Sequence, residues 1–358
     1  MSQPMEDVQP QINLHPQRRR QQAEAQANQT GSSPYFTHSR AQDVTRVVGG
    51  NQTEETEAKV AKPRHRQGLL AFSNGQLTTK RPLVNPISGD DDRRKTLAEV
   101  AEETWKLLPG LLATRPDITT DSYLCRKETL DPARCPKLKP TKVRVVDSDT
   151  IDAALALPYN PHKPVAVLNM ANAYHPGGGW QHGALAQEEA ICYRSSLAKT
   201  LSRKHYPIPD DAAIYSPTVL IIRVNMKNGH TLLDFRDPSQ LDAISVISCA
   251  AVCQPFLKKD AGGRPTYRDQ KDVKLMKEKM RVVLRTAIRN KHRQVVLGAL
   301  GCGAFGNPRH VAAGMWKEVL REAEFQGGYW NDLVFAVLDA KGESNFKVFR
   351  DELDGLVV

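Results

Sequence analysis

The chain has 358 residues, a formal net charge of +10 and 40% hydrophobic residues, and these values narrow the class of protein. No apolar run approaches the ~18 residues that a membrane-spanning helix requires, so we expect no membrane partner. All six cysteines follow residue 124 and are scattered among apolar segments. This pattern excludes a disulfide-rich secreted domain and predicts an intracellular location, in the nucleus, the cytoplasm or both. The positive charge would suit a polyanion, but a basic soluble surface explains it equally well.

Residues 1–90 are predicted to form a disordered arm. The first thirty residues are rich in glutamine, and no apolar period persists in the arm. Such a composition cannot bury enough apolar surface to offset the entropy of the chain. The short basic groups Arg18–Arg20 and Lys62–Arg66 could be contacts for nuclear import or for a polyanion, although we favour a solvated linker.

Ordered structure is predicted over residues 91–358, beginning with a helix. Leu97, Val100 and Leu108 recur at helical spacing, and Pro109-Gly110 is expected to end this helix. Further helices are predicted at Asp149–Leu157, Gln187–Lys204, Val273–Lys291 and Pro308–Phe325, the last with Asn307 as its N-cap. Strands are predicted at Val143–Asp147, Val165–Met170, Thr218–Val224, Ala243–Ala251, Gln294–Leu300 and Asp332–Asp339. Strands that alternate with helices favour an α/β domain with a largely parallel or mixed sheet.

Two glycine-rich loops each follow a predicted strand and precede a predicted helix. The first contains Gly177–Gly179, and after seven residues come Gln187, Glu188 and Glu189. The second is Gly-Cys-Gly-Ala-Phe-Gly, residues 301–306. In such a sheet both loops would meet at the carboxyl ends of the strands, where helix N-termini favour a pyrophosphate. We therefore expect a nucleotide diphosphate as ligand and an acid or base among the adjacent carboxylates.

Other interpretations of these residues are weaker. A tight turn that serves only packing would be the better explanation of a single glycine loop. Two such loops, each between a strand and a helix, favour a ligand site instead. Residues 301–306 match the dinucleotide motif GxGxxG, but Asp339 follows Gly306 by more than the usual spacing of about 20 residues. The pair Cys249 and Cys253 lacks partners for a metal site, and Cys192 fits a helix core better than a nucleophile.

The order of these motifs resembles the poly(ADP-ribose) glycohydrolases, which carry a GGG triplet followed shortly by QEE. The surrounding VLNMANAYHPGGG and CYRSS are similar to the microbial, macrodomain-only branch of bacteria and fungi. The later loop LGCGAFGNP, followed by a helix and FAVLD, is similar to that branch's second ligand loop and last strand. The likeness runs from about Arg93 to Phe349.

This resemblance implies a macrodomain, a three-layer α/β/α sandwich around a mixed sheet, with ADP-ribose in its cleft. It implies that Glu189 is the catalytic acid and that Glu188 is the partner carboxylate that positions the terminal ribose. The other residues that it implies in substrate binding are Asn172, Gly177, Gly178, Gly179, Gln187, Gly301, Cys302, Gly303, Ala304 and Phe305. Among these, Asn172 would hold the distal ribose and Phe305 would pack against it, whereas the adenine contacts are left open.

The implied reaction is cleavage of the ribose–ribose O-glycosidic bond by an exo-acting enzyme that releases ADP-ribose. Glu189 would protonate the leaving oxygen and then deprotonate the attacking water, without a metal or a redox cofactor. The implied partners are poly(ADP-ribose) or ADP-ribosylated proteins, and no nucleic acid is required. Three alternatives remain: an ADP-ribose-binding module without activity, a hydrolase of another ADP-ribose derivative or nucleotide, and a dinucleotide dehydrogenase.

Overall fold

The computed structural model describes residues 90–358 apart from 159, 161–162, 340–341 and 343. Except for Asp90, the arm predicted for residues 1–90 lies outside the described residues. The described part contains a seven-stranded sheet in the order β1-β4-β5-β3-β8-β9-β2 and a separate hairpin of β6 and β7. The strands are β1 Tyr123–Arg126, β2 Arg144–Val146, β3 Ala166–Met170, β4 Ala212–Leu220, β5 Ala243–Cys249, β6 Leu257–Lys259, β7 Pro265–Tyr267, β8 Gln294–Leu297 and β9 Asp332–Ala336.

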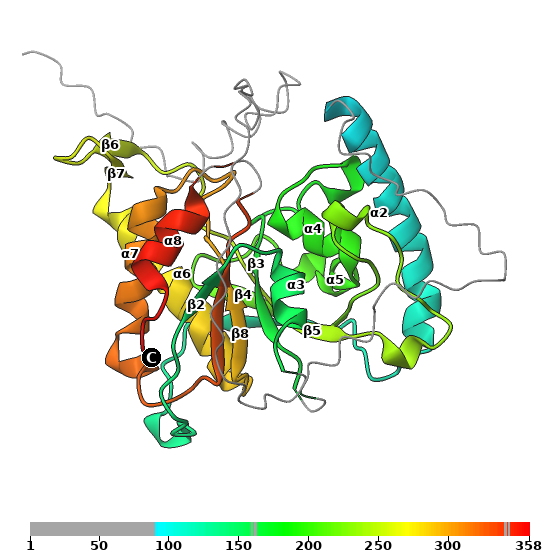
Figure 1. Cartoon of the computed structure of the whole chain (residues 1–358), viewed down its shortest axis with the longest axis horizontal. Coiled ribbons are helices and arrows are strands. Elements are labelled where there is room, and N and C mark those ends of the chain that lie inside the picture. The colour runs from blue at the N-terminus through cyan, green and yellow to red at the C-terminus, as the bar shows by residue number, and fades with distance from the viewer. Residues whose placement is uncertain (1–89, 159, 161–162, 340–341, 343) are drawn as a thin grey trace, which may run out of the picture. The chain divides into compact units, whose positions relative to one another are not determined.

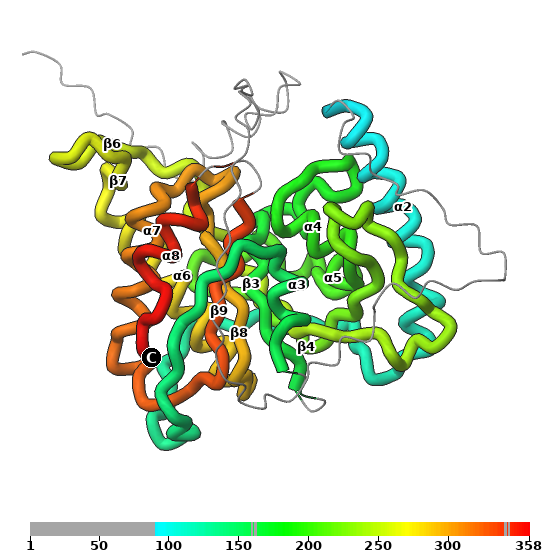
Figure 2. The backbone as a smooth tube through the Cα atoms, in the orientation of Figure 1, coloured from blue at the N-terminus to red at the C-terminus, as the bar shows by residue number. Residues whose placement is uncertain are grey.

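The sheet is mixed, and its parallel part places the loops that matter for function. β5, β3, β8, β9 and β2 are parallel neighbours, for example with Val167 of β3 opposite Val246 of β5. β4 and β1 are joined antiparallel at one edge. Because β3 and β8 are adjacent, the two glycine loops that follow them leave the same edge of the sheet side by side. Figure 2 shows these two strands next to each other within the sheet.

Helices cover both faces of the sheet and complete the predicted three layers (Figure 1). One face carries α6, α7 and α8, and the other carries α2, α3, α4 and α5. The bounds are α2 Asp90–Ala113, α3 Thr150–Leu155, α4 Gln187–Arg194, α5 Leu197–Thr200, α6 Gln270–Arg289, α7 Arg309–Leu320 and α8 Asn345–Leu353. Short 3-10 turns lie at Pro132–Arg134, Trp180–His182, Arg203–His205, Met226–Asn228, Pro238–Gln240 and Ala323–Phe325. No helix in the described part of the chain is long and apolar enough to cross a membrane.

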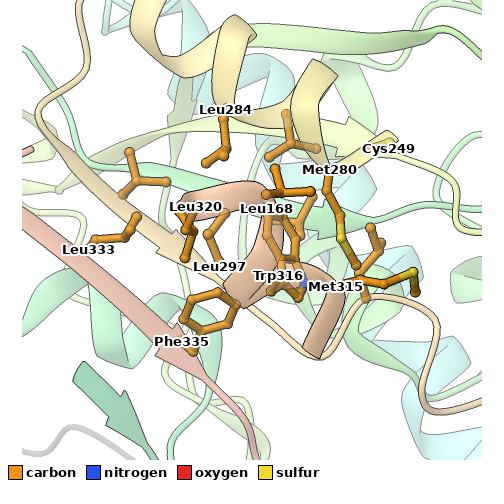
Figure 3. Close-up of a cluster of buried hydrophobic side chains, with 14 of the residues drawn as sticks. Leu168, Cys249, Met280, Leu284, Leu297, Met315, Trp316, Leu320, Leu333 and Phe335 are labelled. Atoms are coloured by element: carbon orange, nitrogen blue, oxygen red, sulfur yellow. The ribbon is translucent and has the colours of Figure 1, made fainter. Parts of the chain in front are cut away.

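The larger apolar core lies between the sheet and the layer of α6, α7 and α8. Figure 3 shows its centre, where Trp316 of α7 packs with Leu297 of β8 and Phe335 of β9. Trp316 and Phe335 meet edge to face, with ring centroids 5.5 Å apart. This core holds the carboxyl ends of β3, β5 and β8 in fixed positions, which keeps the loops beyond them in register.

The structure corrects the predicted end of the first helix. α2 continues through Pro109 and Gly110 and ends at Ala113. Pro109 is exposed, while Leu108 and Leu111 on either side are buried in a small apolar cluster. Burial of these leucines stabilises the last turn, and it outweighs the backbone hydrogen bond that proline cannot donate.

The predicted helix Gln187–Lys204 is divided, and Asn307 is not a helix cap. Ser195 adopts an extended conformation between α4 and α5 and bridges to Ile221. The Ser196 amide donates to the Leu220 carbonyl oxygen at 2.9 Å, so the end of β4 draws the chain out of the helix. The N-cap of α7 is Pro308, because the Asn307 side chain bonds to neighbouring loops instead. The strand β1, the helix α8 and the hairpin β6–β7 were not predicted.

Candidate active site

Three loops meet at the carboxyl edge of the parallel strands. They follow β3, β5 and β8 and comprise residues 171–186, 250–256 and 298–307. Asn307 Nδ2 donates to the Val252 carbonyl oxygen at 2.7 Å, and the Gln254 amide donates to the Phe305 carbonyl oxygen at 2.9 Å. One side-chain and one backbone hydrogen bond therefore fix the second glycine loop to the loop after β5.

Glu189 lies in the first turn of α4 and faces the first glycine loop. Its side chain is only 8% exposed. Oε1 accepts a hydrogen bond from the Gly179 amide at 3.0 Å, and Oε2 accepts one from the Ala186 amide at 3.0 Å. The N-terminus of α4 also favours negative charge at this position. The carboxylate is thus held in one orientation between the loop and the helix.

Gly178 lets the loop backbone lie directly against this carboxylate. Its φ is +59°, in the left-handed region that favours glycine. A Cβ at this position would be 2.2 Å from Glu189 Oε1 and 3.3 Å from Glu188 Oε2. A Cβ at Gly177 would be 2.9 Å from Trp180 Cδ1. In the structure these glycines make space for the glutamates and for Trp180.

Glu188 is buried beneath the same loop, with 2% exposure. Its Oε2 accepts from the Asn172 amide at 2.7 Å, and its Oε1 accepts from the Gly177 amide at 3.2 Å. Burial raises the pKa of Glu188 to about 8, with a further rise from the nearby Glu189, while these hydrogen bonds act in the opposite direction. Glu188 therefore anchors the two ends of the segment from Asn172 to Gly177.

Asn169 is a site residue that the sequence interpretation missed. It lies in β3 with no exposure, and its Nδ2 donates to Glu188 Oε1 at 3.3 Å and to Ser248 Oγ at 2.9 Å. Its Oδ1 is buried and accepts no hydrogen bond from the described residues. The signal in the sequence was an asparagine within the otherwise apolar strand Val165–Met170, since buried polar groups need a specific partner.

Asn172 and Gln187 fix the backbone around Glu188. Asn172 Oδ1 accepts from the amides of Tyr174 and His175 at 2.8 and 3.0 Å, which closes a turn. Gln187 Oε1 accepts from the Met170 amide at 2.8 Å. The Gln187 Nε2 donates to Leu168 and Thr150, so the whole amide is bonded to protein groups. Gln187 thereby ties the start of α4 to the end of β3.

The second loop presents backbone and one aromatic ring. Gly301 has a φ of +76°, and a Cβ there would be 2.4 Å from Asn307 Nδ2. Gly303 and Ala304 are exposed, whereas Cys302 and Phe305 are half-buried against the core. The structure thus brings all the predicted residues of this loop to the same sheet edge as Glu188 and Glu189.

Other features of the described residues lie apart from this edge. No group of three or more His, Cys, Asp or Glu side chains among them is arranged to hold a metal ion. A cavity of about 720 Å³ is lined by residues that include Leu130, Cys135 and Tyr329. These residues precede β2 and β9, so the cavity lies toward the amino ends of the strands. Cys192 is fully buried in the core, as predicted.

Comparisons with known proteins agree with this geometry. Residues 119–224, which include the first glycine loop and α4, match the family model described as "Microbial-type PARG, catalytic domain". A poly(ADP-ribose) glycohydrolase from Deinococcus radiodurans, solved in complex with ADP-ribose, is 29% identical, with a TM-score of 0.53 over 69% of this chain and 98% of that chain. A point mutant of the Deinococcus enzyme, also with ADP-ribose, is 28% identical, with a TM-score of 0.53 over 68% and 97%. The enzyme from Thermomonospora curvata is 24% identical, with a TM-score of 0.55 over 72% and 99%. No match was found among curated protein sequences.

These findings confirm three predictions from the sequence. The fold is a mixed α/β sandwich, and the chain resembles the microbial-type poly(ADP-ribose) glycohydrolases. The match to a catalytic-domain model and the likeness to the Deinococcus enzyme indicate a hydrolase of the glycosidase class.

Proposed function

We propose that the chain cleaves the ribose–ribose O-glycosidic bond of poly(ADP-ribose) from the end of the polymer and releases ADP-ribose. The observation that carries this proposal is the placement of Glu189. Its carboxylate is buried, is held by the Gly179 and Ala186 amides, and lies at the mouth of a loop whose Gly178 has no room for a side chain. The Deinococcus glycohydrolase, named as a complex with ADP-ribose, supports the same class of ligand for this fold.

In this proposal Glu189 acts as general acid and then as general base. It protonates the ribose oxygen that leaves and then removes a proton from the attacking water. Its two amide contacts hold the carboxyl group in one orientation, which reduces the entropy cost of the proton transfers. The transition state carries oxocarbenium character, and Glu189 stabilises that positive charge as it gives up its proton and becomes a carboxylate.

Glu188 would position the terminal ribose through the loop that it anchors. Protein groups occupy both of its oxygens, and it is more deeply buried than Glu189. Asn172 is half-buried, and its Nδ2 donates to no described residue, so this group would hold a ribose hydroxyl. Phe305 would pack against the same ribose from the second loop. The backbone amides of Gly301, Gly303 and Ala304 would bind the diphosphate, since the Cys302 amide donates to the Ala299 carbonyl oxygen.

We further propose that residues 91–358 form the catalytic domain and that residues 1–90 are dispensable for catalysis. The described helices and strands that build the site all lie at or beyond Asp90. The family match also lies wholly within this part of the chain.

The proposal is tested by incubating the full chain with poly(ADP-ribose) and separating the products by chromatography. An exo-acting enzyme yields free ADP-ribose from the first time points. An endo-acting enzyme yields oligomers first. A binding module retains the polymer and releases nothing, which would contradict the proposal. Release only from a different ADP-ribose derivative would assign the site to that derivative instead.

A further inference from the structure

The hairpin β6–β7 is bonded to the second ligand loop but has no part in the proposed reaction. Directly before the hairpin, the Gln254 amide donates to the Phe305 carbonyl oxygen at 2.9 Å. At its end, the Tyr267 hydroxyl donates to Asn307 Oδ1 at 2.6 Å. Both bases of the hairpin are therefore fixed to the segment from Phe305 to Asn307, and the hairpin projects from the body of the domain (Figure 1).

Strand register separates the residues of the hairpin into two faces. Tyr267 is 1% exposed and turned toward the domain, while its strand partner Leu257 is 41% exposed. Lys258 pairs with Thr266 on the opposite, outward face. Because side chains alternate along a strand, Phe256 and Arg268 share the outward face with Lys258. The Arg268 amide donates to the Phe256 carbonyl oxygen, which places these two residues opposite each other.

The outward face combines an exposed aromatic ring with positive charge. Phe256 is 56% exposed, and the Arg268 guanidinium lies 4.3 Å from the centre of its ring. The segment from Gln254 through Lys274 contains six cations and three carboxylates. Two of the carboxylates, Asp260 and Asp269, pair with arginines of the hairpin. The exposed Lys258 forms no ion pair with any described residue. Aromatic stacking beside exposed cations is the combination that binds a phosphate-linked chain of nucleotides.

We propose that this outward face, formed by Phe256, Lys258 and Arg268, binds the part of the poly(ADP-ribose) chain that continues beyond the scissile bond. The inference rests on the proposed function. If Glu189 cleaves at the ribose that packs on Phe305, the remaining polymer leaves from that ribose. The Phe305 carbonyl oxygen accepts a hydrogen bond from the base of the hairpin. The departing chain therefore begins beside the hairpin. An adenine of that chain would stack on Phe256, and its diphosphates would meet Lys258 and Arg268.

The experiment compares two substrates that differ only in the group beyond the scissile bond. Long poly(ADP-ribose) supplies further nucleotide units, whereas an aryl glycoside of ADP-ribose has a scissile bond and no further nucleotide. The test variant is Phe256→Ser with Lys258→Gln. The matched control is Val357→Ser with Lys227→Gln, which removes the same charge and a similarly exposed apolar side chain elsewhere on the surface.

We expect the test variant to raise the KM for the polymer roughly tenfold, from the loss of one stacked base and one phosphate contact. Polymer affinity should also depend less on salt: the steepness of the plot of log affinity against log salt concentration should decrease by about 1. Turnover of the aryl glycoside should stay within about twofold of the unmodified chain, and the control pair should match that chain on both substrates.

Two results would overturn the inference. One is a test variant that binds and cleaves the polymer as well as the control pair does. The other is single-stranded DNA that displaces the polymer from the unmodified chain as effectively as unlabelled polymer does, since the face would then be a general polyanion surface. Failure of the proposed function is distinct: the unmodified chain would cleave neither substrate. Direct polymer binding by the two variants would then still decide the role of the hairpin.

Discussion

Gly178→Ala tests whether the lack of a side chain at residue 178 is needed for the first glycine loop to pack against Glu189. The new Cβ would lie 2.2 Å from Glu189 Oε1, more than 1 Å closer than an ordinary van der Waals contact, which begins at 3.4 Å. The carboxylate is the far end of a flexible side chain, so it should rotate away and lose its hydrogen bond from the Gly179 amide. A displacement of about 1 Å of a reacting group can cost about 10²-fold in rate. We therefore expect kcat to fall about 100-fold.

Two matched controls separate this displacement from the backbone effect. Gly178 has a φ of +59°, and alanine in this region costs about 1 kcal/mol. Gly355 has a φ of +78° with open space at its Cβ position, so Gly355→Ala carries the backbone cost alone. Gly314 in α7 also has open space and no positive φ, so Gly314→Ala should have neither effect.

The assay is release of ADP-ribose from the polymer, with melting temperature measured on the same preparations. Gly178→Ala and Gly355→Ala should each lower the melting temperature by a few degrees, roughly 2–4 °C for a domain of this size. Only Gly178→Ala should lose turnover. If Gly178→Ala turned over polymer within about twofold of Gly355→Ala, the argument that this glycine makes space for the catalytic carboxylate would be refuted.

Three further predictions concern the site and the arm. Phe305→Ala should lower turnover about 10²-fold with a smaller loss of ADP-ribose affinity, because the distal ribose is no longer held; a fall in melting temperature that accounts for the lost activity would instead make Phe305 a core residue. Burial raises the pKa of Glu188 from 4.5 to about 8, so the folded chain keeps a proton there that the unfolded chain releases, and the free energy of unfolding should fall as the pH rises between these values. Glu188 should contribute a decrease of up to roughly 1.4 kcal/mol per pH unit to the free energy of unfolding, and this contribution should be absent when Glu188→Gln is unfolded with denaturant at several pH values. An unchanged pH dependence in Glu188→Gln would contradict a buried, protonated carboxyl group at residue 188. A chain that begins at Asp90 should match the full chain in thermal stability and polymer cleavage, and a large loss of either would show that residues 1–90 contribute to the domain.

Local sequence patterns were sufficient to predict that the two glycine loops lie at the same edge of the sheet. β3 and β8 have continuous apolar runs typical of buried parallel strands, and each is followed by glycines and a helix. Such loops leave the sheet at its carboxyl edge, so residues more than 100 positions apart, such as Glu189 and Phe305, could be expected on one edge. The spacing of GGG and QEE then gave the family resemblance from which Glu188 and Glu189 are proposed as the functional carboxylates.

Features that depend on tertiary contacts were not predictable in the same way. α2 passes Pro109 because Leu108 and Leu111 are buried by residues that are distant in sequence, including Leu220. The break after α4 depends on pairing between Ser195 and Ile221. Asn307 looked like a helix cap, yet its amide bonds to Val252 and Gly301, which only the folded loops bring near. The role of Gly178 likewise required the position of the Glu189 side chain.

The most direct test of the central claim is to measure turnover and ligand binding together on Glu189→Gln. The amide has the shape of the carboxyl group but cannot exchange a proton, and removal of a general acid typically costs about 10²–10⁴ in rate. One of the two amide hydrogen bonds to residue 189 would be lost, so melting temperature is measured on the same protein to show that it is folded. We predict that release of ADP-ribose from the polymer falls by at least about 10²-fold, while calorimetry shows ADP-ribose affinity within a few-fold of the unmodified chain. A folded Glu189→Gln protein with turnover close to that of the unmodified chain would contradict the assignment of Glu189 as the acid and base.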